Sequence, residues 1–281
     1  MLEDQGVAQV LLKRLPLGIS VAYAPRGPLA APERIADAID ALRRALASDR
    51  CASLLCDPEA PDEPSVRATL ASAGVRSSPV FVQPRRTLLM DLAREPQELQ
   101  AAMRKKTRQY VHKAEREGVA TEETRDVDRF LRVLRTVGER DHFAIRSRDY
   151  FDHLMSAFGD RAHMMIARVG ADDAGALLLV HMADRAWELY GGWSGTHAES
   201  RPFYLLKWRA MMRMKQLGVR RYDMWGLAEG PNDPLAGVEN FKLGFGGDVV
   251  TWVGALEVPI NPMLYPLWQL GARRRLARSA A

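Results

Sequence analysis

The residues best suited to chemistry stand late in the chain, in the segment Phe-Lys-Leu-Gly-Phe-Gly-Gly at residues 241–247. One cation, Lys242, is flanked there by two phenylalanines and three glycines. Glycine at this density usually marks a close approach of backbone or ligand. A lysine held against aromatic rings offers a positioned charge whose stem is partly desolvated. Taken alone, the segment is also typical of a glycine-rich turn with a surface lysine.

The elements before this segment would position it. A short apolar strand is predicted from Arg221 to Trp225, ending at Gly226. The residues that follow are rich in glycine, proline, asparagine and aspartate, which predicts a loop rather than regular structure.

Two further candidates lie in the first third of the chain. Arg26 stands between two prolines in residues 23–28, so it is either part of a plain turn or presented by a rigid loop to a phosphate or carboxylate. Asp57 directly follows a short buried strand predicted at residues 52–56. Open α/β sheets place reactive groups at this position, although aspartate is also a common turn residue.

A basic helix is predicted between residues 99 and 118. Its apolar face consists of Leu99, Met103, Tyr110, Val111 and Ala114, and Gly118 closes it. The other faces carry a cluster of cations that includes Lys105, Lys106 and Arg108. Such a run is usually a solvated face, but a one-sided cluster also neutralises phosphates, and we favour nucleic-acid contact.

The composition restricts the class of protein. Hydrophobic residues make up 47% and charged residues 27% of 281 positions, which is typical of a folded soluble protein. The net charge of +5 suits polyanionic partners such as tRNA, nucleotides or anionic membrane. Cys51 and Cys56 lack further ligands at suitable spacing, so we predict free thiols, no metal and a cytoplasmic protein. The longest apolar run, residues 175–180, is too short to span a bilayer.

The remaining pattern predicts an α+β fold. The expected strands are 7–15, 19–23, 52–56, 80–82, 87–92, 163–168, 176–182, 186–190, 221–225 and 249–257. The expected helices are 32–47, 67–73, 99–118, 127–137, 150–158 and one opened by Pro202. The order of these elements after residue 90 is that of an acyltransferase of the GNAT type. However, the sequence lacks the glycine-rich loop that would hold the pyrophosphate of coenzyme A.

Five motifs in one order resemble the Fem family of peptidoglycan bridge-forming aminoacyltransferases. They are residues 23–28, Asp57-Pro58-Glu59, the basic residues 105–108 leading to Ala114 and Gly118, residues 222–226, and residues 241–247. The resemblance covers about residues 7–260. It implies two GNAT-like domains, which we expect at 1–86 completed by 255–281 and at 87–254. Family members usually begin further upstream, so the first domain is expected to lack its usual N-terminal elements.

The resemblance also implies a reaction and partners. An aminoacyl-tRNA would donate its amino acid to the side-chain amine of the third residue of a peptidoglycan stem peptide, and the acceptor would be a UDP-linked muramyl peptide or lipid II. No cofactor is implied, and a monomer is expected. By position, Lys242 would serve the acyl end of the donor and Asp57 would act as a base. Phe241 and Arg26 are expected to contact substrate. Arg146 would hold the acceptor's diphosphate, and Tyr190 would lie near the same site.

These residue types fit ester aminolysis. The attacking amine must be neutral, so a carboxylate helps only within hydrogen-bond reach of it. Attack creates an oxyanion, which a fixed lysine can stabilise. Two alternatives are a GNAT-like transferase with another donor and an inactive protein that binds tRNA or a peptidoglycan precursor. The basic tail at residues 271–278 is compatible with peripheral contact with the inner membrane face.

Overall fold

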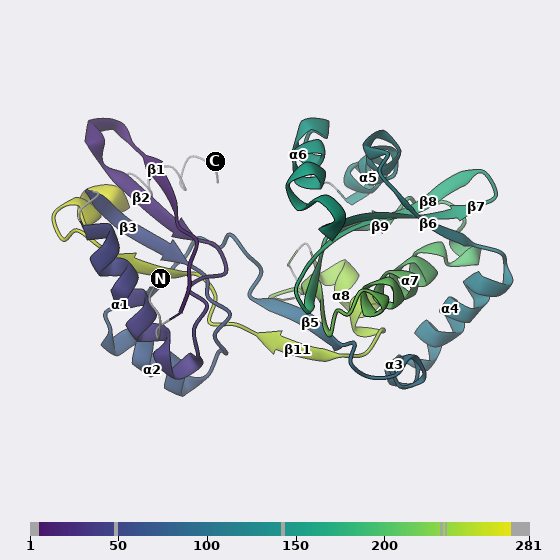
Figure 1. Ribbon diagram of the computed structural model, residues 1–281, viewed down its shortest axis with the longest axis horizontal. Coiled ribbons are helices and arrows are strands. Elements are labelled where there is room, and N and C mark those ends of the chain that lie inside the picture. The colour runs from purple at the N-terminus through teal and green to yellow at the C-terminus, as the bar shows by residue number, and fades with distance from the viewer. Residues whose placement is uncertain (1–5, 48–49, 142–143, 231–232, 234, 271–281) are drawn as a thin grey trace. The chain divides into compact units, whose positions relative to one another are not determined.

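The computed structural model describes residues 6–47, 50–141, 144–230, 233 and 235–270. The chain divides into two compact units (Figure 1). The first unit comprises residues 1–86 and 250–281, and the second comprises residues 87–249.

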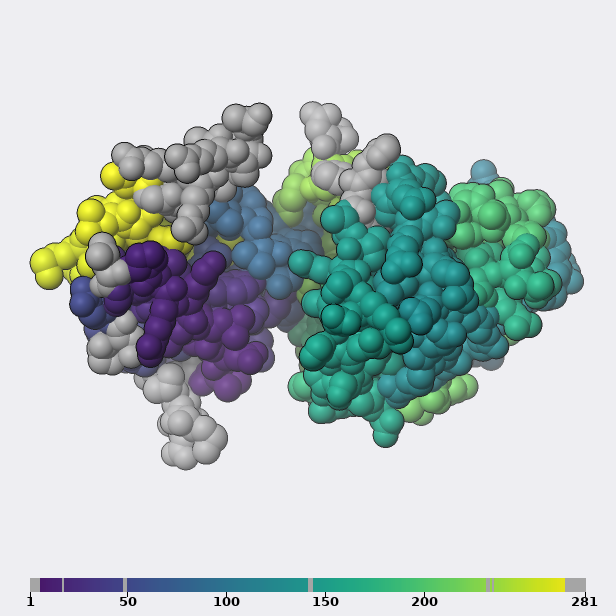
Figure 2. Space-filling view, turned by 90° about the horizontal axis from the view of Figure 1, so that it is seen from above, coloured from purple at the N-terminus to yellow at the C-terminus, as the bar shows by residue number. Residues whose placement is uncertain are grey.

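The first unit is built on a five-stranded sheet in the order β1-β2-β3-β12-β4. The strands are β1 (Leu11–Arg14), β2 (Ser20–Ala24), β3 (Cys51–Cys56), β4 (Arg76–Ser77) and β12 (Leu256–Pro259). Since β12 pairs antiparallel with β3, the C-terminal segment completes the sheet begun by the N-terminal one. Figure 2 shows these purple and yellow ends of the chain packed in the same unit.

Helices α1 (Ile35–Leu46) and α2 (Pro64–Ser72) pack on this sheet. The spacing of Ile35, Ile39, Leu42 and Leu46 creates the stripe that α1 buries against Leu54 and Val258 of the sheet. Every residue of β3 except Leu55 is buried, so the strand is a fixed support for Asp57, which follows it.

The second unit is built on a seven-stranded sheet in the order β11-β5-β10-β9-β8-β7-β6. The strands are β5 (Arg86–Asp91), β6 (Ala120–Thr124), β7 (Ala162–Val169), β8 (Asp172–Met182), β9 (Arg185–Trp193), β10 (Arg221–Gly226) and β11 (Asp248–Thr251). The helices are α3 (Pro96–Ala102), α4 (Lys105–Arg116), α5 (Val127–Asp141), α6 (Arg148–Phe158), α7 (Pro202–Gln216) and α8 (Ala236–Leu243).

Alternation along the strands gives this sheet two packed faces. Met164 and Ile166 of β7 face a core made with α5 and α6, whereas Met165 and Ala167 face a core made with α4 and α7. Figure 1 shows α5 and α6 on one face and α4 and α7 on the other. The sheet is therefore a central layer packed on both faces, and this packing supports the residues at the end of β10.

Four predictions of local structure are wrong. Residues 80–82 are not a strand, and their side chains are exposed. The expected strand 249–257 is two strands, β11 and β12, which belong to different sheets and are separated by Gly254 at φ +81°. The expected loop after Gly226 contains α8.

The fourth error is the single helix at 99–118. It breaks at Met103 and Arg104, both of which have extended backbone. The amide of Arg104 donates to the carbonyl of Gly244 at 2.9 Å instead of continuing the helix. The apolar pattern of the sequence does not show the break, because α3 and α4 pack on the same core.

Within the part of the chain that the structure covers, none of the helices has the length and apolar character needed to cross a membrane.

Candidate active site

Lys242 lies in the last turn of α8 and points at the end of β10. Its Nζ donates to the carbonyl of Gly226 at 2.7 Å and lies 3.4 Å from the carbonyl of Trp225. Trp225 has φ +62°, a left-handed conformation that is rare for a bulky residue. The pairing of β10 with β5 shifts register between Asp223 and Gly226. This irregular strand end directs two carbonyl oxygens at one ammonium group.

Aromatic side chains surround the neighbouring position. Phe241 stacks on Phe203 with ring centroids 5.5 Å apart and meets Tyr204 and Phe245 edge-on. The cation that lies over these rings is Lys207 of α7, whose Nζ is 5.6 Å from the Phe203 ring and 5.8 Å from the Phe241 ring. The ammonium group of Lys242, by contrast, contacts backbone carbonyls of β10.

A buried polar network lies behind Lys242. Lys207 forms an ion pair with Glu188 of β9, and the other oxygen of Glu188 accepts from the hydroxyl of Tyr222 at 2.5 Å. Asp223, next to Tyr222, accepts from the amide of Trp225 at 2.7 Å and from the hydroxyl of Thr87. These contacts fix both the direction of β10 and the turn that presents the carbonyls.

The surroundings make the charge of Lys242 easy to remove. Burial lowers the pKa of Lys242 from 10.5 to about 8, with a further lowering by the charge of Lys207. The carboxylates of Glu188 and Asp223 act in the opposite direction. A lysine with such a pKa exists in both protonation states near neutral pH, as an acid–base group in a transfer reaction requires.

Sequence reasoning missed Glu188, Lys207 and Asp223. Their signal was present, since Glu188 and Lys207 are charges of opposite sign inside apolar patterns of a strand and a helix. Only the fold shows that the two patterns meet.

Arg146 and Tyr190 are brought together on the opposite face of the second unit, at the start of α6. Tyr190 donates to the hydroxyl of Tyr150 at 3.1 Å, and the guanidinium of Arg146 lies 5.7 Å from the Tyr150 ring. Burial, followed by the contact with Tyr150, raises the pKa of Tyr190 to about 12. An exposed guanidinium beside two neutral phenols can donate several hydrogen bonds to phosphate oxygens.

Asp57 is buried at the end of β3 in the first unit, and both of its oxygens accept hydrogen bonds. Oδ2 accepts from the hydroxyl of Tyr23 at 2.8 Å and Oδ1 from the amide of Arg26 at 2.5 Å. Burial raises the pKa of Asp57, whereas these two donors oppose the rise. The geometry makes the carboxylate an anchor for the loop at residues 24–28.

The side chain of Arg26 is also engaged within the first unit. Its guanidinium donates to the carbonyl of Pro84 at 3.0 Å, and its Nε lies 4.0 Å from a carboxylate oxygen of Glu59. Arg26 has φ +50°, so a strained turn holds it in place. The structure brings Arg26 and Asp57 together, a contact that the sequence did not predict.

The predicted cluster on α4 separates into two kinds of residue. Lys105 and Lys106 are exposed in the first turn of the helix. Arg108 folds back on α3, where its Nη1 lies 3.1 Å from the carbonyl of Gln100 and 3.5 Å from that of Met103. Arg108 therefore satisfies carbonyls that the helix end leaves open.

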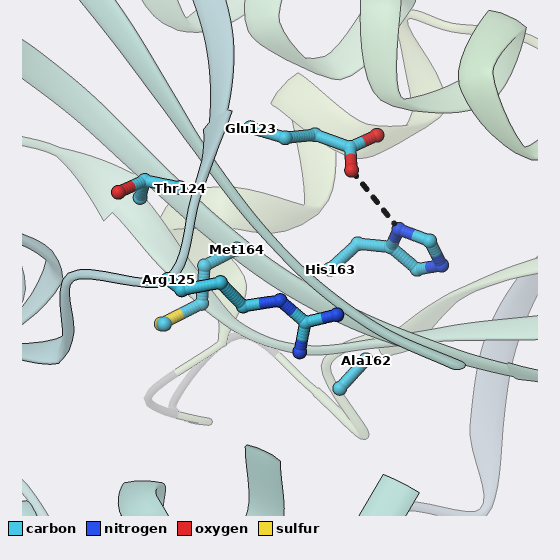
Figure 3. A pocket seen from close by; sticks show the side chains of 6 residues that line it. All are labelled: Glu123, Thr124, Arg125, Ala162, His163 and Met164. Carbon is cyan, nitrogen blue, oxygen red and sulfur yellow. Dashed lines mark hydrogen bonds and ion pairs between the residues drawn. The ribbon is translucent and has the colours of Figure 1, made fainter. Parts of the chain in front are cut away.

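A separate pocket lies at the β6–β7 edge of the second unit, lined by Glu123, Thr124, Arg125, Ala162, His163 and Met164 (Figure 3). Figure 3 shows the Glu123 carboxylate directed at the ring of His163, 3.4 Å away. Glu123 also pairs with Arg213, and His163 contacts His181 at 3.0 Å. Glu123, His163, His181 and Arg213 thus satisfy one another's hydrogen bonds and charges.

Comparisons with known proteins identify the class. The FemAB family model matches residues 76–174 and 171–273, so the chain belongs to the FemAB family. The resemblance drawn from the five motifs is confirmed.

Individual relatives agree with this assignment. A lipid II:glycine glycyltransferase of Staphylococcus aureus is 25% identical over 170 residues, which are 55% of this chain and 40% of that protein. The chain thus aligns with less than half the length of this relative.

Solved structures establish the fold. The crystal structure of FemX superposes with a TM-score of 0.83 at 18% identity, covering 94% of this chain and 87% of that one. A tandem GNAT protein from the clavulanic acid biosynthesis pathway gives a TM-score of 0.51 at 18% identity, covering 91% of this chain and 80% of that one. The α+β fold with two GNAT-like parts is therefore confirmed.

Proposed function

We propose that this protein transfers an amino acid from aminoacyl-tRNA to the side-chain amine of a peptidoglycan stem peptide, as a monomer. The acceptor is a UDP-linked muramyl peptide or lipid II. Membership of the FemAB family and the glycyltransferase named among its relatives support this class of reaction. The observation that carries the proposal is Lys242, a lysine of lowered pKa fixed on two backbone carbonyls.

The chemistry follows from the residues present. The amine of the acceptor attacks the ester carbonyl of the donor, and the negative charge that develops on the carbonyl oxygen needs a fixed cation. Lys242 supplies that cation once it is protonated, and the preceding residue, Phe241, contacts substrate. No covalent intermediate on the protein is needed.

The other candidate residues receive binding roles. Arg146 and Tyr190 hold the diphosphate of the acceptor, since a guanidinium and neutral hydroxyls suit phosphate oxygens. Lys105 and Lys106 contact the tRNA backbone, and the loop of Arg26 lies at the substrate. Asp57 accepts the proton that the acceptor's ammonium group loses before attack, which leaves the amine neutral.

We place the reaction in the cytoplasm, with peripheral contact with the inner membrane face when lipid II is the acceptor. Met263, Leu267 and Leu270 are exposed apolar residues near the C-terminus, and the sequence that follows them is rich in arginine. Apolar side chains beside arginines suit an anionic bilayer surface.

A transfer assay tests the proposal. Purified protein is incubated with UDP-linked muramyl pentapeptide or with lipid II and a mixture of charged tRNAs, and the acceptor is weighed by mass spectrometry. We expect a gain of one aminoacyl residue. Lys242→Ala should abolish the gain while acceptor binding remains, and Lys13→Ala, at an exposed residue of β1, should change neither.

Two results would overturn the proposal. A gain only with an acyl-coenzyme A would make the protein a GNAT-like transferase with another donor. The absence of any gain, with tRNA or precursor still bound, would identify a binding protein.

A further inference from the structure

The ion pair between Lys207 and Glu188 is unusually well buried. Lys207 is 2% exposed, Glu188 5% and Tyr222, which donates to Glu188, 0%. The three residues come from α7, β9 and β10, so they join the helix layer to the centre of the sheet.

A buried ion pair of this kind adds little to the stability of the folded state. Removing two charges from water costs several kcal/mol for each ion, and well-packed apolar residues often replace a buried pair without loss. The apolar cluster on this side of the sheet includes Leu206, Met211 and Met224. The pair therefore calls for a role beyond packing.

The position of Lys207 indicates that role. Its Nζ lies 5.8 Å from the ring of Phe241, the residue next to Lys242. The partner Tyr222 stands on the same strand as Trp225 and Gly226, whose carbonyls face Lys242. Lys207 thus lies beside the residue that precedes Lys242 in α8, and its partner Tyr222 belongs to the strand that Lys242 contacts.

We propose that Lys207, held in place by Glu188 and Tyr222, is a positioning residue that shifts Lys242 further toward its neutral form than burial alone does. The catalytic meaning of this proposal rests on the proposed function, whereas the electrostatic coupling itself does not. A second positive charge nearby disfavours the charged form of Lys242, and a low local dielectric strengthens the effect.

Other charged groups near Lys242 also affect its pKa, in both directions. Glu188 of β9 and Asp223 of β10 favour the charged form, while burial and Lys207 disfavour it. Arg104, before α4, contacts the carbonyl of Asn240, and Glu239 lies on α8 itself. Lys207 is the cation among these groups that lowers the pKa of Lys242.

A neutral Lys242 can carry a proton from the attacking nitrogen to the leaving oxygen during aminolysis. As the new C–N bond forms, neutral Lys242 accepts a proton from the attacking nitrogen and becomes an ammonium group beside the oxyanion. As the ester C–O bond breaks, the same proton passes to the leaving ribose oxygen. Lys242 ends in the state in which it began.

The test measures the protonation of Lys242 directly. Full-length protein is labelled with trace acetic anhydride between pH 6 and 11, and acetylation of each lysine is quantified by mass spectrometry, with Lys13 as an internal reference. We expect Lys242 of the native protein to reach half-maximal reactivity near pH 8. In Lys207→Met the midpoint should rise by about one unit, a tenfold change in the ratio of neutral to charged Lys242.

Three companion variants make the result decisive. The double variant K207M/E188Q leaves no unpaired charge, and its midpoint should also rise, though by less, because Glu188 opposes Lys207. Lys207→Arg keeps the charge and should keep the midpoint. Lys215→Met removes a lysine of the same helix whose Nζ is held by the carbonyls of Leu92 and Arg94, and it should leave the midpoint unchanged.

An unchanged midpoint in both K207M and K207M/E188Q would overturn the proposal. Because the labelling uses no substrate, it gives an answer even if the transfer assay fails. If transfer is observed, K207M should lower kcat more than it changes KM at neutral pH and should recover at alkaline pH.

Discussion

Lys242 donates a hydrogen bond of 2.7 Å to the carbonyl of Gly226, and this contact joins the end of α8 to the end of β10. The carbonyl is available because the residue before it, Trp225, adopts a left-handed backbone conformation held by Asp223. Backbone strain of this kind is commonly found at functional sites. The contact holds the ammonium group in one place while burial makes its charge costly.

We predict that Lys242→Met stabilises the protein at pH 7 while it removes transfer activity. The pKa of Lys242 is about 8 in the folded protein and 10.5 when unperturbed. Below pH 8 the folded state therefore carries a penalty for the charge, which disappears as the pH rises from 8 to 10.5. The gain should be on the order of 1–2 kcal/mol, since the lost hydrogen bonds offset part of the penalty.

Urea unfolding at pH 7 and pH 10 measures this effect. The difference between variant and native protein should shrink at pH 10, where native Lys242 is neutral in the folded state. A variant that is less stable than the native protein at pH 7 would show that the carbonyl contacts outweigh the charge penalty.

We predict different consequences for the basic residues of α4. Lys105→Ala and Lys106→Ala should weaken tRNA binding and lower the slope of log K against log salt by up to about one each, because each lysine neutralises one phosphate. Arg108→Ala should instead lower the free energy of unfolding by about 1–2 kcal/mol, because it leaves carbonyls of α3 without a partner. Filter binding across a salt series, beside urea unfolding, separates the two effects. A loss of stability in the lysine variants would contradict the assignment.

We predict that Asp57→Asn destabilises the first unit. Both oxygens of Asp57 accept hydrogen bonds, so the amide group of asparagine must direct its own donors at the Tyr23 hydroxyl or at the Arg26 amide. The cost of an unsatisfied buried group is about 1–3 kcal/mol. Tyr23→Phe removes a single donor and should cost less. Equal stabilities of D57N and native protein in urea would show that the anchor is dispensable.

Much of this architecture was predictable from local pattern. The stripe from Ile35 to Leu46 predicted α1, Pro202 marked the start of α7, and the short apolar run before Asp57 predicted β3. In each case the periodicity or the starting residue directly reflects how the element is buried.

The errors arise where tertiary contacts decide the structure. Helix α8 buries no residue fully and carries a glycine within it, so its sequence resembles a loop. The break before α4 depends on Gly244, which lies 140 positions later and receives the amide of Arg104. The role expected of Lys242 came from the resemblance of five ordered motifs to the Fem family, whereas its coupling to Lys207 depends on the packing of α7 on β9.

We predict that Gly244→Ala displaces α8 and thereby Lys242. A Cβ at this position would overlap the hydroxyl of Thr107 and lie 3.0 Å from the carbonyl of Phe241. The position cannot move away easily, because its carbonyl accepts from the amide of Arg104 at 2.9 Å. Overpacking of this kind costs about 1–3 kcal/mol. Transfer should fall with it, since Lys242 stands two residues earlier.

Thr107→Ala supplies the complementary change. Removing the hydroxyl leaves only ordinary contact between the new methyl group and the Cβ at 107, so T107A/G244A should recover much of the loss. The two variants should therefore be non-additive in urea unfolding. Gly237→Ala is the matched control, because a Cβ there meets nothing within 4 Å and α8 should gain about 0.5–1 kcal/mol. A double variant whose loss equals the sum of the single losses would show that the Thr107 hydroxyl is not what makes glycine necessary at position 244.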